Sequence, residues 1–132
     1  MLAEIKGTPL DELPWGRFSY DTVLHQHEEA CILLERDSAG RLYLAWWSDA
    51  DQDTERFVCL PLTKARLQAI LSDEISPLSA MENPEDGYLL AVDIDLETDK
   101  PVRIIKTTAA ALPQDAMPHP EATLNIPMPA TV

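Results

Sequence analysis

Short apolar runs separated by turn residues dominate the hydrophobic pattern of the chain. Residues 30–37 (ACILLERD) form one such run, residues 38–41 (SAGR) supply a turn, and residues 42–47 (LYLAWW) are apolar again. Residues 56–62 (RFVCLPL) continue the pattern, and Pro61 within them cannot donate to a strand ladder, which places it near a strand end or edge. The pattern predicts three strands in an antiparallel meander.

Two helices are indicated after the third of these strands. Thr63 is a good N-cap residue, and the residues that follow it place apolar side chains on one stripe at helical spacing. Ser76 followed by Pro77 repeats the start signal, and Pro84 disfavours helix before it, so a short second helix ends by residue 83. The apolar stripe of the first helix consists of Leu67, Ile70 and Leu71.

Residues 87–97 (GYLLAVDIDLE) show the clearest alternation in the chain. One face of this predicted strand is apolar and includes Leu96, whereas the other face includes Asp93 and Asp95 in its second half. We therefore expect these two carboxylates on a solvated face, which is a simpler interpretation than a general acid and base pair. Residues 102–106 (VRIIK) offer a partner strand.

These segments predict a single α+β domain over residues 1–112, with an antiparallel sheet of about five strands and one or two helices packed on one face. A further strand is indicated near residues 17–24 (RFSYDTVL). A chain of 132 residues that is 45% hydrophobic is long enough for one core. Residues 113–132 are rich in proline and are expected to form an extended tail. Its apolar residues can dock on the domain or on a partner: Leu124, Ile126 and Met128.

The net charge of the chain disfavours some classes of function. Ten Lys and Arg residues oppose 23 Asp and Glu residues, giving a formal net charge of −13. The resulting field repels nucleic-acid backbones and anionic lipids, so direct binding to nucleic acid or membrane is not expected. The same field favours a basic protein as partner.

The chain is expected to be cytoplasmic. No apolar run approaches the ~20 residues that span a bilayer, and the first residues lack the basic-then-apolar order of a secretory signal. Cys31 and Cys59 each lie within an apolar run, which predicts reduced, buried thiols.

The segment WWSDADQDTERF places acidic residues at alternate positions. Asp49, Asp51 and Asp53 match the first three ligand positions of an EF-hand loop, but the glycine and closing glutamate positions hold Thr54 and Leu60. The EF-hand interpretation therefore fails. A looser calcium site in a hairpin loop remains as an alternative to a simple solvated turn.

The same segment supplies the candidate partner-binding residues: Trp46, Trp47, Asp49, Asp51 and Asp53. The two tryptophans point to opposite faces of their predicted strand. One of them is expected in the core and the other beneath a helix or available to a partner, because an exposed Trp marks a binding patch.

Other candidate chemistry is limited. His25, His27, Glu29 and Cys31 share one face of an extended segment, but its ends are about 20 Å apart, so only neighbouring pairs could meet one ion. Ordinary histidines and an inert buried thiol are the simpler interpretation. The four glycines are widely separated, which leaves no P-loop or dinucleotide fingerprint. No metal, cofactor or catalytic residue is predicted.

Residues 33–92, LLERDSAGRLYLAWWSDADQDTERFVCLPLTKARLQAILSDEISPLSAMENPEDGYLLAV, resemble a family of small uncharacterised bacterial domains. In that family a glycine turn leads to a YL strand, an acidic loop, a VP(V/L) strand, a helix and a PEDGY-type segment. The resemblance implies the same α+β order and carries over no functional residue. Residues 22–30 (TVLHQHEEA) are longer than the corresponding link in the family.

Without a catalytic constellation, the sequence favours a small bacterial protein that binds another protein as an accessory, regulatory or immunity-type partner. Two alternatives stay open. The first is an acidic mimic of nucleic acid, which requires carboxylates arrayed on one face. The second is an enzyme whose site is assembled from distant residues, which a pocket with convergent, perturbed carboxylates or histidines would indicate.

Overall fold

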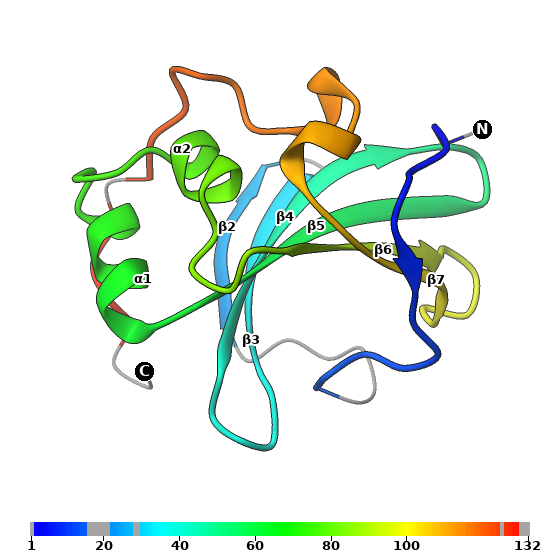
Figure 1. Cartoon of the computed structure of the whole chain (residues 1–132), viewed down its shortest axis with the longest axis horizontal. Helices are drawn as coiled ribbons and strands as arrows, with labels where there is room; N and C mark the ends of the chain where they lie inside the picture. Colours follow the sequence, from blue (N-terminus) through cyan, green and yellow to red (C-terminus); the bar gives the residue numbers. More distant parts are fainter. Residues whose placement is uncertain (1, 16–21, 28–29, 125, 130–132) are drawn as a thin grey trace.

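One antiparallel sheet forms the centre of the molecule (Figure 1). The computed structural model describes residues 2–15, 22–27, 30–124 and 126–129, and the side chains of residues 22–31 and 115 lie outside the description. Its strands follow the order β1-β7-β6-β5-β4-β3-β2, and all neighbours are antiparallel. The strands are β1 (Thr8–Pro9), β2 (Thr22–His27), β3 (Ala30–Arg36), β4 (Leu42–Ala50), β5 (Thr54–Leu62), β6 (Leu89–Asp95) and β7 (Pro101–Thr107).

The α+β class is confirmed, whereas the strand number is larger than the predicted five. Six strands, β2 to β7, form a meander, and the two-residue β1 extends its β7 edge. The extra long strand is β2, which lies in the region where the sequence indicated only a further strand near residues 17–24. Residues 16–21 of that region are outside the description.

The two predicted helices lie between β5 and β6, and both begin at the expected caps. Helix α1 (Lys64–Leu71) starts after Thr63, whose hydroxyl accepts a hydrogen bond from the Arg66 amide at 3.2 Å. Helix α2 (Pro77–Glu82) starts after Ser76, whose hydroxyl accepts from the Ser79 amide at 3.1 Å. Neither helix, nor any other in the described residues, is long and apolar enough to cross a membrane.

Both faces of the sheet carry a hydrophobic core, because successive side chains of each strand point to opposite faces. Leu44 and Ala45 are neighbours in β4, yet each belongs to a different buried cluster. The helix-side core contains the buried faces of α1 and α2. The opposite core includes Leu33, Tyr43, Ala45, Phe57, Cys59, Leu90, Val92, Ile94 and Ile104.

The N-terminal segment wraps around the β7 edge and contributes to both cores. Ile5 is buried in the helix-side core, β1 then pairs with β7, and Leu13 is buried in the opposite core. Figure 1 shows this segment in blue beside β7. Gly7 lies at the crossing point, where a Cβ atom would stand 2.3 Å from the Lys106 carbonyl oxygen. Only a glycine lets the two backbones approach so closely.

The C-terminal segment also packs on the domain. After β7 it forms two short 3₁₀ helices, η1 (Ala109–Ala111) and η2 (Gln114–Ala116), and then runs past α2 (Figure 1). Leu124 is buried in the helix-side core, and the Ile126 amide donates to the Leu71 carbonyl oxygen at 3.1 Å. The apolar residues of the predicted tail thus dock on this domain itself.

Candidate functional site

The two tryptophans of the acidic segment are packing residues. Trp46 is partly buried against the helix-side core, and Trp47 is partly buried against the opposite core. Their strand positions explain this, because Trp46 lies opposite Val58 and Trp47 opposite Phe57 in β5. The structure therefore places the predicted tryptophan pair on two different faces, and it gathers no joint binding patch from them.

Asp51 and Asp53 lie in the β4–β5 turn, Asp49 lies near the end of β4, and the three aspartates differ in their contacts. Asp51 accepts hydrogen bonds from the Asp53 amide and from the amide and hydroxyl of Thr54, each at 2.9 Å. These bonds lower the pKa of Asp51 to about 2. Asp49 accepts from the next amide, at 2.8 Å, and the side chains of Asp49 and Asp53 are both exposed. Asp51 builds the turn, and Asp53 faces solvent.

The β6–β7 turn is built in the same way and lies against the β4–β5 turn. The Asp95 carboxylate accepts from the amides of Glu97 and Thr98 at 2.8 and 2.9 Å, and these bonds lower the pKa of Asp95. The Leu96 amide donates to the Asp53 carbonyl oxygen at 2.9 Å. This bond joins two turns that are more than 40 residues apart in the sequence.

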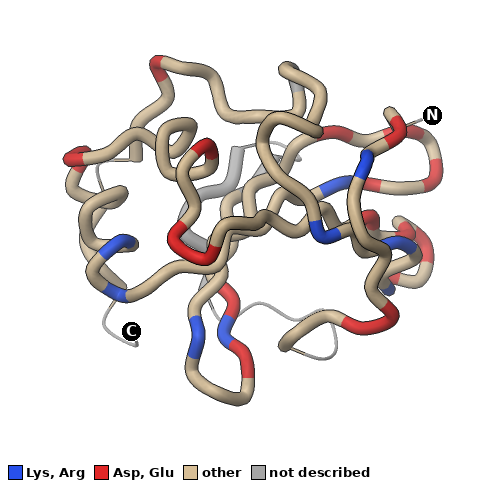
Figure 2. The backbone as a smooth tube through the Cα atoms, in the orientation of Figure 1, with Lys and Arg blue, Asp and Glu red and all other residues tan. Residues whose placement is uncertain are grey.

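We call the surface formed by these turns the acidic end. It carries exposed carboxylates from both turns and one exposed cation, Lys100. Among the described residues, Leu96 and Val102 are the large hydrophobic side chains that remain exposed, at 49% and 58%. Figure 2 shows acidic residues on both turns at the right of the molecule. The exposed carboxylates of the acidic end belong to Asp53, Glu97 and Asp99.

Leu96 was expected in the buried face of its strand, and that prediction is wrong. Strand β6 ends at Asp95, whose carboxylate bonds the next amides and turns the chain. Leu96 therefore belongs to the turn, where the alternation of the strand no longer applies. Its apolar side chain next to a run of polar turn residues is the sequence signal that could have identified it.

Asp93 was expected on a solvated face, and this prediction is also wrong. Asp93 is 6% exposed and Arg56 is 1% exposed. The Arg56 Nε and Nη2 atoms donate to the two Asp93 carboxylate oxygens at 2.6 and 3.0 Å, and Nη1 donates to the Ala3 carbonyl oxygen at 2.8 Å. The wrapped N-terminal segment covers this part of the sheet and excludes solvent from the Asp93 face. The charges of Arg56 and Asp93 are therefore buried as an ion pair.

Metal and nucleophile chemistry receives no geometric support in the described residues. Within them, no group of three or more His, Cys, Asp or Glu side chains is placed to hold a metal ion. The side chains of His25, His27, Glu29 and Cys31 lie outside the description. Cys59 is a free, fully buried cysteine, and burial together with the nearby Glu35 charge raises the pKa of its thiol.

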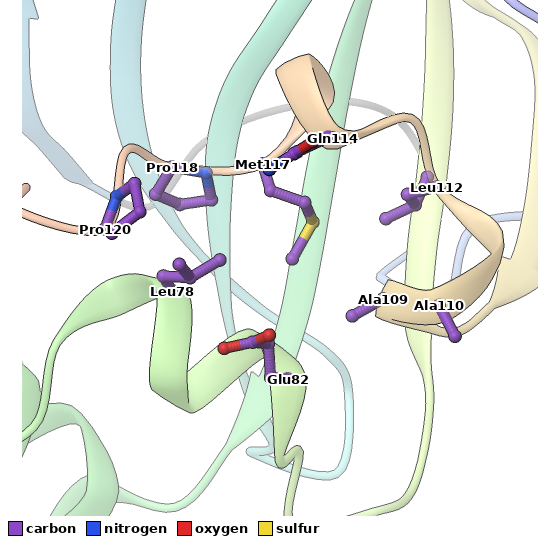
Figure 3. Close-up of a pocket in the computed structure, with 9 residues that line it drawn as sticks. All are labelled: Leu78, Glu82, Ala109, Ala110, Leu112, Gln114, Met117, Pro118 and Pro120. Atoms are coloured by element: carbon purple, nitrogen blue, oxygen red, sulfur yellow. The ribbon is translucent and has the colours of Figure 1, made fainter.

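A cavity of about 390 Å³ lies between α2 and the C-terminal segment (Figure 3). Its walls are mostly apolar, and the Met117 side chain extends across it toward α2. Glu82 is the one charged residue among the described residues of its lining, so these residues supply no pair of groups for acid and base catalysis. It is a crevice between packed segments of the fold.

Comparisons with protein-family models, with curated proteins and with solved structures found no match to this chain. The functional proposal therefore rests on the geometry of the described residues. Of the five candidate residues from the sequence, Asp51 and Asp53 lie in one turn, Asp49 lies beside it near the end of β4, and the tryptophans do not join them. Leu96, Glu97 and Asp99 of the β6–β7 turn, and the exposed Val102 that follows this turn in β7, were not predicted as site residues.

Proposed function

We propose that this chain is a protein-binding domain, without catalytic activity of its own, whose acidic end docks on a basic surface of another protein. The observation that carries the proposal is the hydrogen bond between the Leu96 amide and the Asp53 carbonyl oxygen. It brings the exposed carboxylates of two distant turns beside the exposed Leu96 side chain. A role as an accessory, regulatory or immunity-type protein in a bacterial cytoplasm fits such a surface.

The acidic end has the composition of a small interface. Leu96 and Val102 offer apolar contact area, and Asp53, Glu97 and Asp99 supply charge around it. Protein interfaces commonly combine an apolar centre with a polar rim, and a few central residues contribute most of the binding energy. The carboxylates favour a partner with Lys or Arg at matching positions.

Preorganisation supports the same conclusion. Asp51 and Asp95 fix the two turns through hydrogen bonds to backbone amides, so neither turn has to be ordered when a partner arrives. Lower ordering cost means that more of the contact energy appears as affinity. The net charge of −13 accelerates encounter with a basic partner, and salt screens this effect.

The two alternatives receive less support from the structure. A nucleic-acid mimic requires carboxylates arrayed along one face, whereas acidic residues in Figure 2 lie on turns and helices around the molecule. An enzyme site assembled from distant residues would need convergent carboxylates in a cleft. The buried carboxylates among the described residues belong to Asp93, which is paired with Arg56, and to Glu35, which strand alternation places on the opposite face of the sheet.

Affinity capture with charge-reversal variants tests the proposal. The chain is immobilised and exposed to a lysate of its native host at low salt, and bound proteins are quantified by mass spectrometry. The test variant combines Asp53→Lys with Glu97→Lys, both on exposed side chains of the acidic end. The matched control combines Glu12→Lys with Glu74→Lys, which changes the net charge equally at exposed positions elsewhere.

We expect a basic protein to be retained by the original chain and by the control, and to be lost from the test variant. Retention should fall at high salt because the attraction is electrostatic. If the test and control variants lost the bound protein equally, net charge alone would explain the binding, and this result would contradict a specific binding surface. Retention of the same proteins by the test variant would contradict the proposal as well.

A further inference from the structure

A shallow surface pocket that is wide open to solvent, with a volume of about 600 Å³, lies at the far end of β7 from the acidic end. Its walls are formed by β1 and the residues beside it, by Gly87 and Tyr88 just before β6, by the end of β7 and by η1. Two lysines, Lys6 and Lys106, line it, and none of the described residues in its lining is acidic. In a chain with a net charge of −13, a pocket with two cations and no carboxylate is electrostatically exceptional.

The two lysines differ from three of the arginines, whose charges are neutralised by ion pairs. Arg41, Arg56 and Arg103 each form an ion pair with a carboxylate. Within the described part of the chain, neither Lys6 nor Lys106 forms an ion pair. The Lys106 ammonium lies 4.4 Å from the centre of the Tyr88 ring, so it is held over an aromatic face that leaves its remaining donors free.

Hydroxyl and backbone groups complete the lining. Thr8 and Thr108 line the pocket, and among the described residues their hydroxyls make no hydrogen bond, so they can donate to a ligand. The Thr107 hydroxyl is already used, because it donates to the Lys6 carbonyl oxygen at 2.7 Å. This bond fixes the backbone of Lys6 against β7, so one lysine is anchored to the strand that carries the other.

We propose that this pocket binds a small oxyanion with two negative charges, such as the phosphate of a phosphate monoester. Two ammonium groups balance a dianion, and lysine is a compact point charge well suited to phosphate. The Thr8 and Thr108 hydroxyls add neutral donors. The site is independent of the proposed function, since β7 separates it from the acidic end. The overall negative field of the chain slows the approach of an anion, whereas the two lysines attract the anion once it is near the pocket.

Nuclear magnetic resonance titration tests the site. Amide resonances of the full, isotopically labelled chain are followed as inorganic phosphate is added near neutral pH, with sodium chloride holding the ionic strength constant. Acetate, a monoanion, is titrated in parallel. We expect saturable shifts at Thr8, Gly87 and Thr108 with phosphate, and weaker ones with acetate.

Lysine substitutions locate the binding. We expect Lys106→Gln to weaken phosphate binding about tenfold, because a charged hydrogen bond is lost, and Lys106→Arg to retain it within a few-fold. Lys6→Gln should weaken binding similarly, and it provides a second test if the Lys106 change disturbs the sheet. The controls Lys64→Gln and Lys100→Gln alter exposed lysines outside the pocket and should leave binding unchanged.

Several outcomes would overturn the site. Amide shifts that do not saturate with phosphate, or that are equally large near every lysine, would indicate only general electrostatic screening and no binding site. If neither Lys6→Gln nor Lys106→Gln changed the affinity for phosphate, the pocket would not be the binding site. Equal responses to acetate and phosphate would contradict recognition of a dianion.

Discussion

Arg56 in β5 and Asp93 in β6 face each other across neighbouring strands and form a buried, two-pronged ion pair. The Ala3 carbonyl oxygen accepts a further hydrogen bond from Arg56, so three distant segments meet at one guanidinium group. Such a pair is costly to break, because removal of one partner leaves the other charge buried without compensation.

Asp93→Ala is therefore expected to lower the free energy of unfolding by about 3–5 kcal/mol. Replacing both partners together, with Arg56→Met and Asp93→Leu, should recover much of this loss, because no uncompensated charge remains. Urea denaturation gives both values, and Glu97→Ala at an exposed position is the control, expected within about 0.5 kcal/mol of the parent. A loss for Asp93→Ala no larger than that of the control would contradict the buried pair.

Gly7→Ala tests the wrapped N-terminal segment. The added Cβ atom would stand 2.3 Å from a backbone oxygen of β7, so β1 has to move away from its partner strand. We expect a loss of about 1–3 kcal/mol in stability and faster hydrogen exchange at the Leu10 amide, which donates to the Ile104 carbonyl oxygen. Thr8→Ala, at the neighbouring exposed position, should change neither quantity much. A Gly7→Ala variant with unchanged exchange at Leu10 would show that the segment does not pack as described.

The lowered pKa of Asp51 predicts that the free energy of unfolding falls at acid pH. Its pKa is lowered from an ordinary value of 3.8 to about 2 in the folded chain, so the ionised form stabilises the fold above pH 3.8. This contribution is lost as the pH falls through the interval from 3.8 to 2. Asp51→Asn removes the titrating group, so the stability difference between parent and variant should shrink across that interval. A difference that is constant from pH 5 to pH 2 would contradict the hydrogen-bonded role of this carboxylate.

Cys59 should resist alkylation in the folded chain. Its thiol is fully buried and its pKa is raised, so little reactive thiolate is exposed near pH 8. We expect peptide mapping by mass spectrometry to show the Cys59 peptide unmodified after iodoacetamide treatment, and fully modified when the same reaction is done in urea. Rapid alkylation of this peptide without urea would indicate an accessible, reactive cysteine.

Local signals predicted much of the fold. Thr63, Ser76 and Pro77 mark the helix starts because capping depends on neighbouring residues alone. Alternation and the glycine turn likewise placed the strands from β3 to β7. The N-terminal wrap could not be predicted, since Ile5 and Leu13 have no periodic pattern and each is buried by strands distant in the sequence.

Long-range pairing explains why parts of the site were missed. Alternation placed Asp93 correctly on one face of β6, but whether that face is wet depends on Arg56, 37 residues earlier, and on the segment that covers it. The acidic end also depends on contacts between residues that are distant in the sequence. The β4–β5 turn was recognised from its aspartates, whereas its contact with Leu96 arises only when the two turns pack together.

Photocross-linking at the acidic end tests the proposed function most directly. The photoreactive residue p-benzoylphenylalanine replaces Leu96, Val102 or, as the control, Ala39, which is exposed in the β3–β4 turn at the opposite end of β4. In the native host we predict adducts with one basic protein from positions 96 and 102, none from position 39, and loss of the adducts when Asp53→Lys and Glu97→Lys are added. Adducts from position 39 alone, adducts that survive the two charge reversals, or no adduct from either acidic-end position would contradict the proposal.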